Sequence, residues 1–396
     1  MNAREPQAQA GSASSPGSHC TVTLVPIEEA IGDRTLYAQW QALLAGSTQL
    51  DALYQSPEWC EHLMRVTPGL RAWAAVARDE SGAICGVAPV RLGQFVLRYD
   101  VAARSLWNRP LATAFLMGSQ PLFGASAEAY AQLLRAIWEQ VPACDAVYMN
   151  SVPTGSVLWE FLETLRHRRS EGIVYLPDGV RPHYWIALPE DFEKYLAKFS
   201  SRKRYNLRAA AKKIAAARPE TLRLVRVETP EQVESFVTDA VAVSRRSWQQ
   251  ARIGDRIEDS EAQRAQLLDL AHRGLLRSYL LQCGATTYAC AIGWQHADTY
   301  HGVEIAFDQD HAELSPGTVL LYLIIQDVIS HNRAQRFDLG IGAGAHKQQF
   351  SNASFDDASV LVLRPTAAAR VLVASHALLR ALAVTARKLL TGREKR

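Results

Sequence analysis

One order of secondary-structure signals occurs twice along the chain, and it constrains the fold more than any other feature. In the first half, two β-rich runs around the turn DESG (71–93) are followed by a helix with one apolar face (126–141) and a strand (145–152). In the second half, residues 275–307 divide into three strands at the turns CGA and HAD. A helix (318–331) and the strand RFDLGIG follow. A match in both order and spacing predicts a duplicated α/β unit with mixed sheets.

Helical signals precede each set of strands. LYQSPEWCEHLMRV (53–66) is typical of a helix that is capped near Ser56 and has Pro57 at its first position. A long helical region (228–273) precedes the strands of the second half. The stretch that follows residues 71–93, to about residue 125, is punctuated by Gly and Pro, residues that interrupt strands and helices, and the sequence pattern assigns no element to it.

Composition along the chain suggests where the domains end. The Pro and Gly of VYLPDGVRPHY (174–184) predict a linker, so we expect one domain over 21–175 and a second over 183–365. Residues 1–20 are rich in Ala, Ser and Gly and lack the apolar segment of a secretory signal, which predicts a disordered leader. The tail 366–396 mixes Leu and Val with Arg and Lys. It is either a basic amphipathic helix on an anionic membrane or a helix packed on the second domain.

The composition is that of a globular protein of a reducing compartment. Hydrophobic residues make up 48% of the chain and charged residues 21%, enough for a core of native size. The six Cys form no C-x-x-C pair, and most lie in apolar runs, as buried thiols do. We find no uncharged apolar run of about 18 residues for a spanning helix. We therefore expect a cytoplasmic protein, or one peripheral at the inner face of the membrane. His296 and His301 do not share a strand face, so no metal site is expected.

Positive charge is concentrated in one segment. Residues 194–219 contain nine Lys and Arg and no acid, although the net charge of the whole chain is only +3. Arg204, Arg208 and Lys212 are spaced four residues apart and form one stripe of a helix. The stripe either faces an anionic ligand or is a solvated surface. No recognised nucleic-acid motif accompanies it.

A glycine-rich stretch, FDLGIGAGAHKQQFSN, satisfies the letter of the dinucleotide fingerprint through Gly340, Gly342 and Ala345. A dinucleotide fold needs a second strand and an acid about 20 residues further on. Only HKQQFSNAS separates this loop from the next strand, ASVLVL. A P-loop would need Gly-Lys-Ser/Thr where the chain has Ala345, His346 and Lys347. We interpret the loop as a strand exit that brings His346 and Lys347 to an active cleft.

A second loop has the geometry of a phosphate cradle. Ser315, Gly317 and Thr318 lie where a strand-to-helix connection enters the apolar helix TVLLYLIIQDVISH. The exposed N–H groups and the dipole of such a helix start attract anions. The alternative is an ordinary helix cap, and the acids in DQDHAEL just before it favour that alternative.

Three motifs carry a resemblance to a known family: FSSRKRYNLRAAAKKI (199–214), VEIAFDQDHAELSPGTVLLYLII (303–325) and FDLGIGAGAHKQQFSN (337–352). Their order resembles the GNAT acyltransferase fold. The duplicated form is similar to the Fem-type and CelD-like acyltransferases, which are associated with cellulose and exopolysaccharide. The resemblance covers residues 30–365 and is strongest over 185–350. It implies a duplicated GNAT-like fold of the α/β class, with α+β mixed sheets.

The resemblance also implies an activity. Such a protein would move an acyl group from an acyl-CoA, for example acetyl-CoA, to an amine or hydroxyl of a small-molecule or glycan acceptor related to sugars or the cell envelope. Two alternatives stay open. One is a Fem-like peptidyltransferase that uses aminoacyl-tRNA, the one case in which nucleic acid is an expected partner. The other is a non-catalytic accessory protein of polysaccharide assembly.

The resemblance assigns roles to residues of this chain. In Fem-type proteins the Lys at the position of Lys347 stabilises negative charge during transfer, and Asp338 is its natural partner. A general base is held on the strand that contains His301 and Glu304. The candidate acyl-CoA residues are Ser315, Gly317 and Thr318, and the candidate acceptor residues are Arg204, Arg208, Lys212, Trp248 and His346. Trp248 is either a wall on which a sugar stacks or an aromatic residue of the core. Of the family's pyrophosphate loop only Gly317 is present, and His346 replaces the family's aromatic residue.

Overall fold

The computed structural model describes residues 20–393 except 102–103, 124–125, 169–170, 217–221, 249, 251–253, 255, 332–333 and 343. The leader expected over 1–20 therefore lies, apart from Cys20, outside the described residues. The chain divides into two compact units. Unit 1 comprises Met1–Cys60, Leu70–Gly179 and Ala358–Arg396, and unit 2 comprises Glu61–Gly69 and Val180–Asp357. Unit 2 thus ends at Asp357, whereas the boundary expected from the sequence is residue 365.

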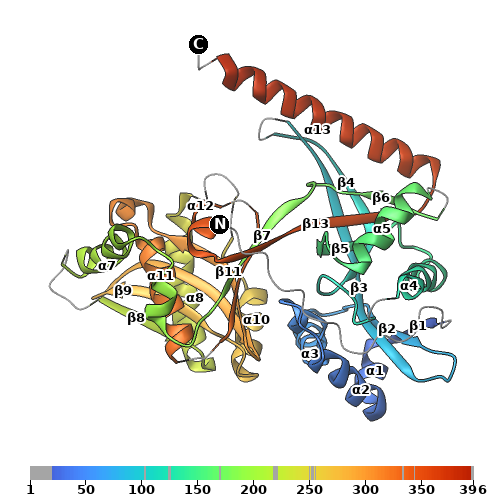
Figure 1. Cartoon of the computed structure of the whole chain (residues 1–396), viewed down its shortest axis with the longest axis horizontal. Helices are drawn as coiled ribbons and strands as arrows, with labels where there is room; N and C mark the ends of the chain where they lie inside the picture. Colours follow the sequence, from blue (N-terminus) through green and yellow to red (C-terminus); the bar gives the residue numbers. More distant parts are fainter. Residues whose placement is uncertain are drawn as a thin grey trace. The chain divides into compact units, whose positions relative to one another are not determined.

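Unit 1 is built on a mixed sheet (Figure 1). Its strands are β1 (Thr21–Pro26), β2 (Ala72–Arg78), β3 (Ile84–Val101), β4 (Arg104–Leu116), β5 (Ala146–Pro153), β6 (Ile173–Tyr175) and the C-terminal part of β13 (Ala353–Leu363). β1 to β4 pair antiparallel in sequence order, and β4 pairs parallel with β5. Its helices are α1 (Ile27–Gly32), α2 (Arg34–Ala45), η1 (Ala52–Gln55), α4 (Ala127–Gln140), α5 (Val157–His167) and α13 (Ala367–Arg393). Helix α3 (Pro57–Val66) begins in unit 1 and ends in unit 2.

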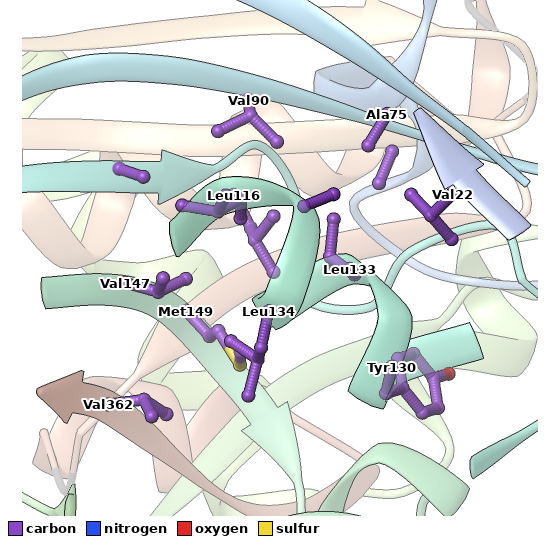
Figure 2. Packing of buried hydrophobic residues seen from close by; sticks show 14 of the residues in the cluster. Val22, Ala75, Val90, Leu116, Tyr130, Leu133, Leu134, Val147, Met149 and Val362 are labelled. Carbon is purple, nitrogen blue, oxygen red and sulfur yellow. The ribbon is translucent and has the colours of Figure 1, made fainter. Parts of the chain in front are cut away.

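The core of unit 1 lies between its sheet and α4 (Figure 2). Leu133 and Leu134 of α4 are buried together with Val90, Leu116 and Val147 of the strands. The expected apolar face of the helix is therefore confirmed. The expected cap is confirmed as well, because the backbone N–H of Trp59 donates to Ser56 Oγ at 3.0 Å.

Unit 2 repeats this plan. Its strands are β7 (Arg181–Ala187), β8 (Leu222–Val227), β9 (Ser278–Cys283), β10 (Thr286–His296), β11 (Thr299–Phe307), β12 (Arg336–Ile341) and the N-terminal part of β13. Its helices are α6 (Phe192–Leu196), α7 (Ser201–Ala216), α8 (Pro230–Arg245), α10 (Glu261–His272), η2 (Gln309–Leu314), α11 (Pro316–Ser330) and α12 (Ala345–Phe350). β8 to β11 pair antiparallel in sequence order and β11 pairs parallel with β12, as β1 to β5 do. The predicted duplication is confirmed and extends to the first strand of each half.

The structure has strands in a stretch to which the sequence pattern assigns no element. Most of residues 94–116 belong to the continuation of β3 and to β4, which form a long antiparallel ribbon. Gly93 pairs with Thr113, and a Cβ at Gly93 would lie 3.1 Å from the ring of Phe115, so the ladder has close packing that favours glycine at this position. Pro110 takes part in the ladder opposite Val96. The residues interpreted as strand breakers are therefore accommodated within the strands.

The basic tail forms the long helix α13, and it packs on unit 1 rather than on the second domain. Tyr99 of β3 donates its hydroxyl hydrogen to the carbonyl of Leu372, at 3.1 Å. In the part of the chain that the structure describes, no helix is long and apolar enough to cross a membrane.

Candidate functional site

A cavity of about 410 Å³ in unit 2 lies where two parallel strands separate. The pairing of β11 with β12 ends at His301 opposite Asp338, whereas β10 stays paired with β11 as far as Phe307. The edge of β11 beyond His301 therefore opens onto the cavity, and Gly302 to Ile305 line it. Backbone groups of this edge can reach a ligand that occupies the gap.

A β-bulge decides which side chains of β11 share a face. Trp294 is opposite His301 and Ile292 is opposite Glu304, so Val303 is an extra residue in the ladder. Strict alternation would put His301 and Glu304 on opposite faces, but the bulge puts them on the same face. Only Glu304 lines the cavity, while His301 is buried with its Nδ1 3.5 Å from Asp338 Oδ2.

Glu304 is a buried carboxylate held by an arginine. Arg256 Nε donates to its Oε2 at 2.9 Å, and both side chains line the cavity. Burial raises the pKa of Glu304 above its ordinary value, although Arg256 and Lys347 act in the opposite direction. A carboxylate with a raised pKa is a better proton acceptor than an exposed one. Sequence reasoning did not identify Arg256, which lies in the loop after α8 with no motif around it.

Lys347 reaches the cavity from α12, the short helix that follows the glycine-rich loop. Its Nζ donates to the carbonyl of Ile341 at 2.8 Å. Gly340 and Gly342 have φ of +74° and +106°, a backbone that other residues rarely adopt, so the glycines allow this return of the chain. Burial lowers the pKa of Lys347, and the charges of Asp338 and Glu304 oppose that shift. His346 also lines the cavity.

An Asp–His–Asp triad with a buried central histidine contacts the first residue of the glycine-rich loop. His183 of β7 bonds through Nε2 to Asp338 Oδ1 and through Nδ1 to Asp357 Oδ2, each at 2.8 Å. Burial disfavours the charged imidazole, but the two carboxylates outweigh burial and raise the pKa of His183 to about 9. Asp338 Oδ1 also accepts from the N–H of Gly340 at 2.7 Å. The triad therefore anchors the first glycine of the loop that carries Lys347.

The start of α11 forms another wall of the cavity. Ser315, Gly317 and Thr318 all line it. Ser315 has the left-handed φ of 54° and does not cap the helix with its side chain; its carbonyl accepts from the N–H of Thr318 at 3.0 Å. A Cβ on Gly317 would lie 3.0 Å from Phe307 Cδ1, so this position favours glycine.

The acids before α11 are less unfavourable to an anion than the sequence suggested. Asp308 is buried, and its carboxylate accepts from Arg246 Nε at 2.7 Å and from the N–H of Asp310 at 3.0 Å. Its charge is therefore compensated within the protein. Lys213 of α7 donates to the carbonyl of Glu313 at 3.2 Å, which brings the basic helix beside the loop.

The predicted basic stripe lies on α7. In the part of the chain that the structure describes, Arg204, Arg208 and Lys212 do not line the cavity. Leu207 on the other side of the helix is buried, as expected. Arg208 pairs with both oxygens of Glu193 at 2.8 Å, and Arg204 Nη2 contacts Ser201 Oγ at 3.2 Å. Lys212 is exposed. Trp248, in contrast, lies at the cavity and is 41% exposed.

Among the described residues, no group of three or more His, Cys, Asp or Glu side chains is arranged to hold a metal ion. The functional groups that line the cavity include the carboxylate of Glu304, the guanidinium of Arg256, the ammonium of Lys347, the imidazole of His346 and the N-terminus of α11.

Comparisons with known proteins agree with this architecture. The described fold is a duplicated GNAT fold, and residues 201–348 match the family model for the acetyltransferase (GNAT) domain. The solved structure of FemX is similar over 82% of this chain and 95% of its own, at 12% identity and a TM-score of 0.57. A tandem GNAT protein from the clavulanic acid biosynthesis pathway, solved without AcCoA, is similar over 87% of this chain and 99% of its own, at 15% identity and a TM-score of 0.52. No curated protein matches the chain significantly.

Proposed function

We propose that the protein is an acyltransferase that binds an acyl-CoA in the cavity of unit 2 and transfers the acyl group to an amine or hydroxyl. One observation carries the proposal: Glu304 and Lys347 meet at the open edge of β11, in a cavity that the N-terminus of α11 also lines. A base, a cation and a helix start in one pocket are the groups that acyl transfer from an anionic donor requires.

The residues present fit an acyl-CoA. The cavity volume of about 410 Å³ lies within the range of small-molecule sites, roughly 300–1,000 Å³. Gly317 permits close approach to the start of α11, and the α11 dipole favours a phosphate there. The loop itself has no basic side chain, but Lys213 lies beside it on α7. We assign the pyrophosphate to Ser315, Gly317 and Thr318, with α7 supplying positive charge.

The reaction follows from the groups in the cavity. The nitrogen or oxygen of the acceptor forms a bond to the acyl carbon, the carbon–sulfur bond breaks, and CoA leaves as the thiolate. Glu304 accepts the proton of the acceptor, and Arg256 fixes the orientation of the carboxylate. Lys347 stabilises the negative charge that develops on the carbonyl oxygen, together with a backbone N–H of the β11 residues that line the cavity.

The acceptor that we propose is a sugar or an envelope-related glycan of the kind found in cellulose or exopolysaccharide assembly. The partly exposed indole of Trp248 at the cavity supports this choice, because aromatic faces stack on sugar rings. His346 completes the acceptor side, and the lowered pKa that burial and Lys347 give it keeps its imidazole neutral. A cytoplasmic location would give the enzyme access to acyl-CoA.

Incubation of the protein with acetyl-CoA and a panel of amino sugars and neutral sugars tests the proposal, with mass spectrometry of the products. We expect one acetylated product with release of free CoA. Glu304→Gln should reduce turnover by about 100-fold or more, the usual contribution of a general base. If CoA esters bind but no acceptor is modified, the protein is an accessory that has retained the donor site.

A second candidate is a Fem-like transferase that uses aminoacyl-tRNA. It is favoured by α7, where Tyr205 is 72% exposed among basic residues, an arrangement that suits a nucleic acid. Filter binding of charged and uncharged tRNA distinguishes the two donors. Tight binding of aminoacyl-tRNA, together with no binding of acetyl-CoA, would select this second function.

A further inference from the structure

A stripe of large apolar side chains on α13 faces away from the protein. Val371, Leu378 and Leu382 are 69%, 62% and 58% exposed. Their spacings of seven and four residues put them on one face of the helix. Such side chains are usually buried, so three of them exposed on one face of the same helix indicate a surface that is covered by something else.

The other face of α13 is firmly attached to unit 1. The hydroxyl of Tyr99 bonds to the carbonyl of Leu372 and lies 3.0 Å from Ser375 Oγ. His376 is buried, with Nε2 3.0 Å from the carbonyl of Arg98 and Nδ1 against the hydroxyl of Tyr175. These contacts fix the rotation of α13 about its axis, and the apolar stripe therefore stays exposed on the face that does not contact unit 1.

The charge of this segment is of one sign. Residues 367–393 contain Arg370, Arg380, Arg387, Lys388 and Arg393 and no acidic residue. Among the described side chains, Arg370 is exposed and Arg380 Nη1 lies 3.8 Å from Asp178 Oδ1, a long and partly exposed pair. A cationic helix with an apolar face matches a surface that is both anionic and apolar.

We propose that α13 is a docking surface for the anionic lipid face of a membrane, with Val371, Leu378 and Leu382 inserted among the acyl chains and Arg370 at the phosphate level. A second copy of the chain fits less well, because pairing two such helices would bring cations against cations. A helix that lies at the membrane–water interface is stabilised in two ways. Its apolar side chains are buried among the acyl chains, and each basic residue near the surface is attracted to anionic lipid by roughly 1 kcal/mol. The inference does not depend on the reaction proposed for unit 2.

Sedimentation of the full-length chain with vesicles tests the proposal. The vesicles consist of equal parts phosphatidylglycerol and phosphatidylcholine, with phosphatidylcholine alone as the comparison. We expect binding to the anionic vesicles that weakens with salt, and at least about tenfold weaker binding to the neutral ones. Absence of binding, or equal binding to both vesicles at low and high salt, contradicts the proposal.

Two variants separate the apolar and the charged contributions. Leu378→Gln with Leu382→Gln should weaken vesicle binding by at least about tenfold, because both side chains lose their burial. Arg370→Gln should weaken it by about fivefold and reduce the salt dependence. Leu268→Gln on α10, which removes a 39% exposed leucine in unit 2, is the matched control and should bind as the unaltered protein does. If the leucine pair changes the oligomeric state in sedimentation equilibrium but leaves vesicle binding intact, the stripe is a contact between copies and the proposal is wrong.

Discussion

Lys347 is a half-buried cation that lines the cavity beside Glu304. It is held by the carbonyl of Ile341, and the charges of Asp338 and Glu304 act on it in a buried setting. An exposed Lys347–Asp338 ion pair, the structural alternative suggested by the sequence, does not describe this environment, because Asp338 is engaged with His183 and the N–H of Gly340.

We expect Lys347→Ala to lower turnover by at least about tenfold, which corresponds to roughly 1.4 kcal/mol of barrier. The KM for the acceptor should change little, because the charge acts on the transition state more than on the bound substrates. Steady-state kinetics with acetyl-CoA measures both. Full turnover combined with a lower melting temperature would show that Lys347 supports the fold and not the reaction.

His183 makes a pH-dependent contribution to stability. Its folded-state pKa of about 9 lies above the ordinary unfolded value of about 6.5. The stabilisation from the protonated imidazole is therefore fully present below pH about 6.5 and is lost as the pH rises through about 9. The side chain is buried between two carboxylates, so its removal also leaves Asp338 and Asp357 without their common partner.

We expect His183→Gln to reduce the free energy of unfolding by about 3 kcal/mol or more at pH 6, as loss of a partner from a buried charged group does. The difference from the unaltered protein should shrink between pH 6.5 and 9.5. Urea unfolding across this range measures it, with the exposed His272→Gln as the matched control. A constant difference at every pH would mean that the imidazole is neutral in the folded protein.

The sequence predicts helix α7 and its buried face, but it does not predict which residues the basic side chains of α7 contact. The i, i+4, i+8 spacing identified the helix and its buried side, with Leu207 inside. The partner of Arg208 was missed because Glu193 lies one residue before the acid-free segment. Only folding shows that α6 and α7 are arranged so that these two side chains meet.

We expect the triple variant Arg204→Gln, Arg208→Gln, Lys212→Gln to weaken acetyl-CoA binding by about tenfold at low salt and less at high salt. The melting temperature should stay nearly unchanged, because the solvent-exposed Arg208–Glu193 pair contributes little to stability and the loss of like-charge repulsion offsets it. Exposed arginines of unit 1, Arg34, Arg109 and Arg135, changed to Gln, provide the control of equal charge. Equal affinities of the two triple variants would identify the stripe as a solvated surface.

Features of the fold that depend on neighbouring residues could be predicted from the sequence, whereas contacts between distant residues could not. Hairpins, caps and helix faces depend on neighbouring residues, so the turn at Gly82, the cap at Ser56 and the repeat order were all predictable. The long ribbon of β3 and β4 was missed because Gly93 and Pro110 break strands on average but not in this ladder. The Asp338–His183–Asp357 triad joins residues up to 174 positions apart, and no local spacing signals it.

The central claim is that the cavity of unit 2, at the start of α11, is the acyl-CoA site of the protein. Isothermal titration of acetyl-CoA into the unaltered chain, into Gly317→Val and into Gly155→Val tests it most directly. Gly155 has open space around its Cβ position and serves as the control, whereas a side chain at Gly317 would press on Phe307 and fill the start of α11. The account predicts one site per chain in the unaltered protein and in Gly155→Val, and at least about tenfold weaker binding in Gly317→Val, which should still give the circular dichroism spectrum of the folded protein. Absence of binding to the unaltered protein at millimolar acetyl-CoA, or equal binding to all three proteins, would contradict it.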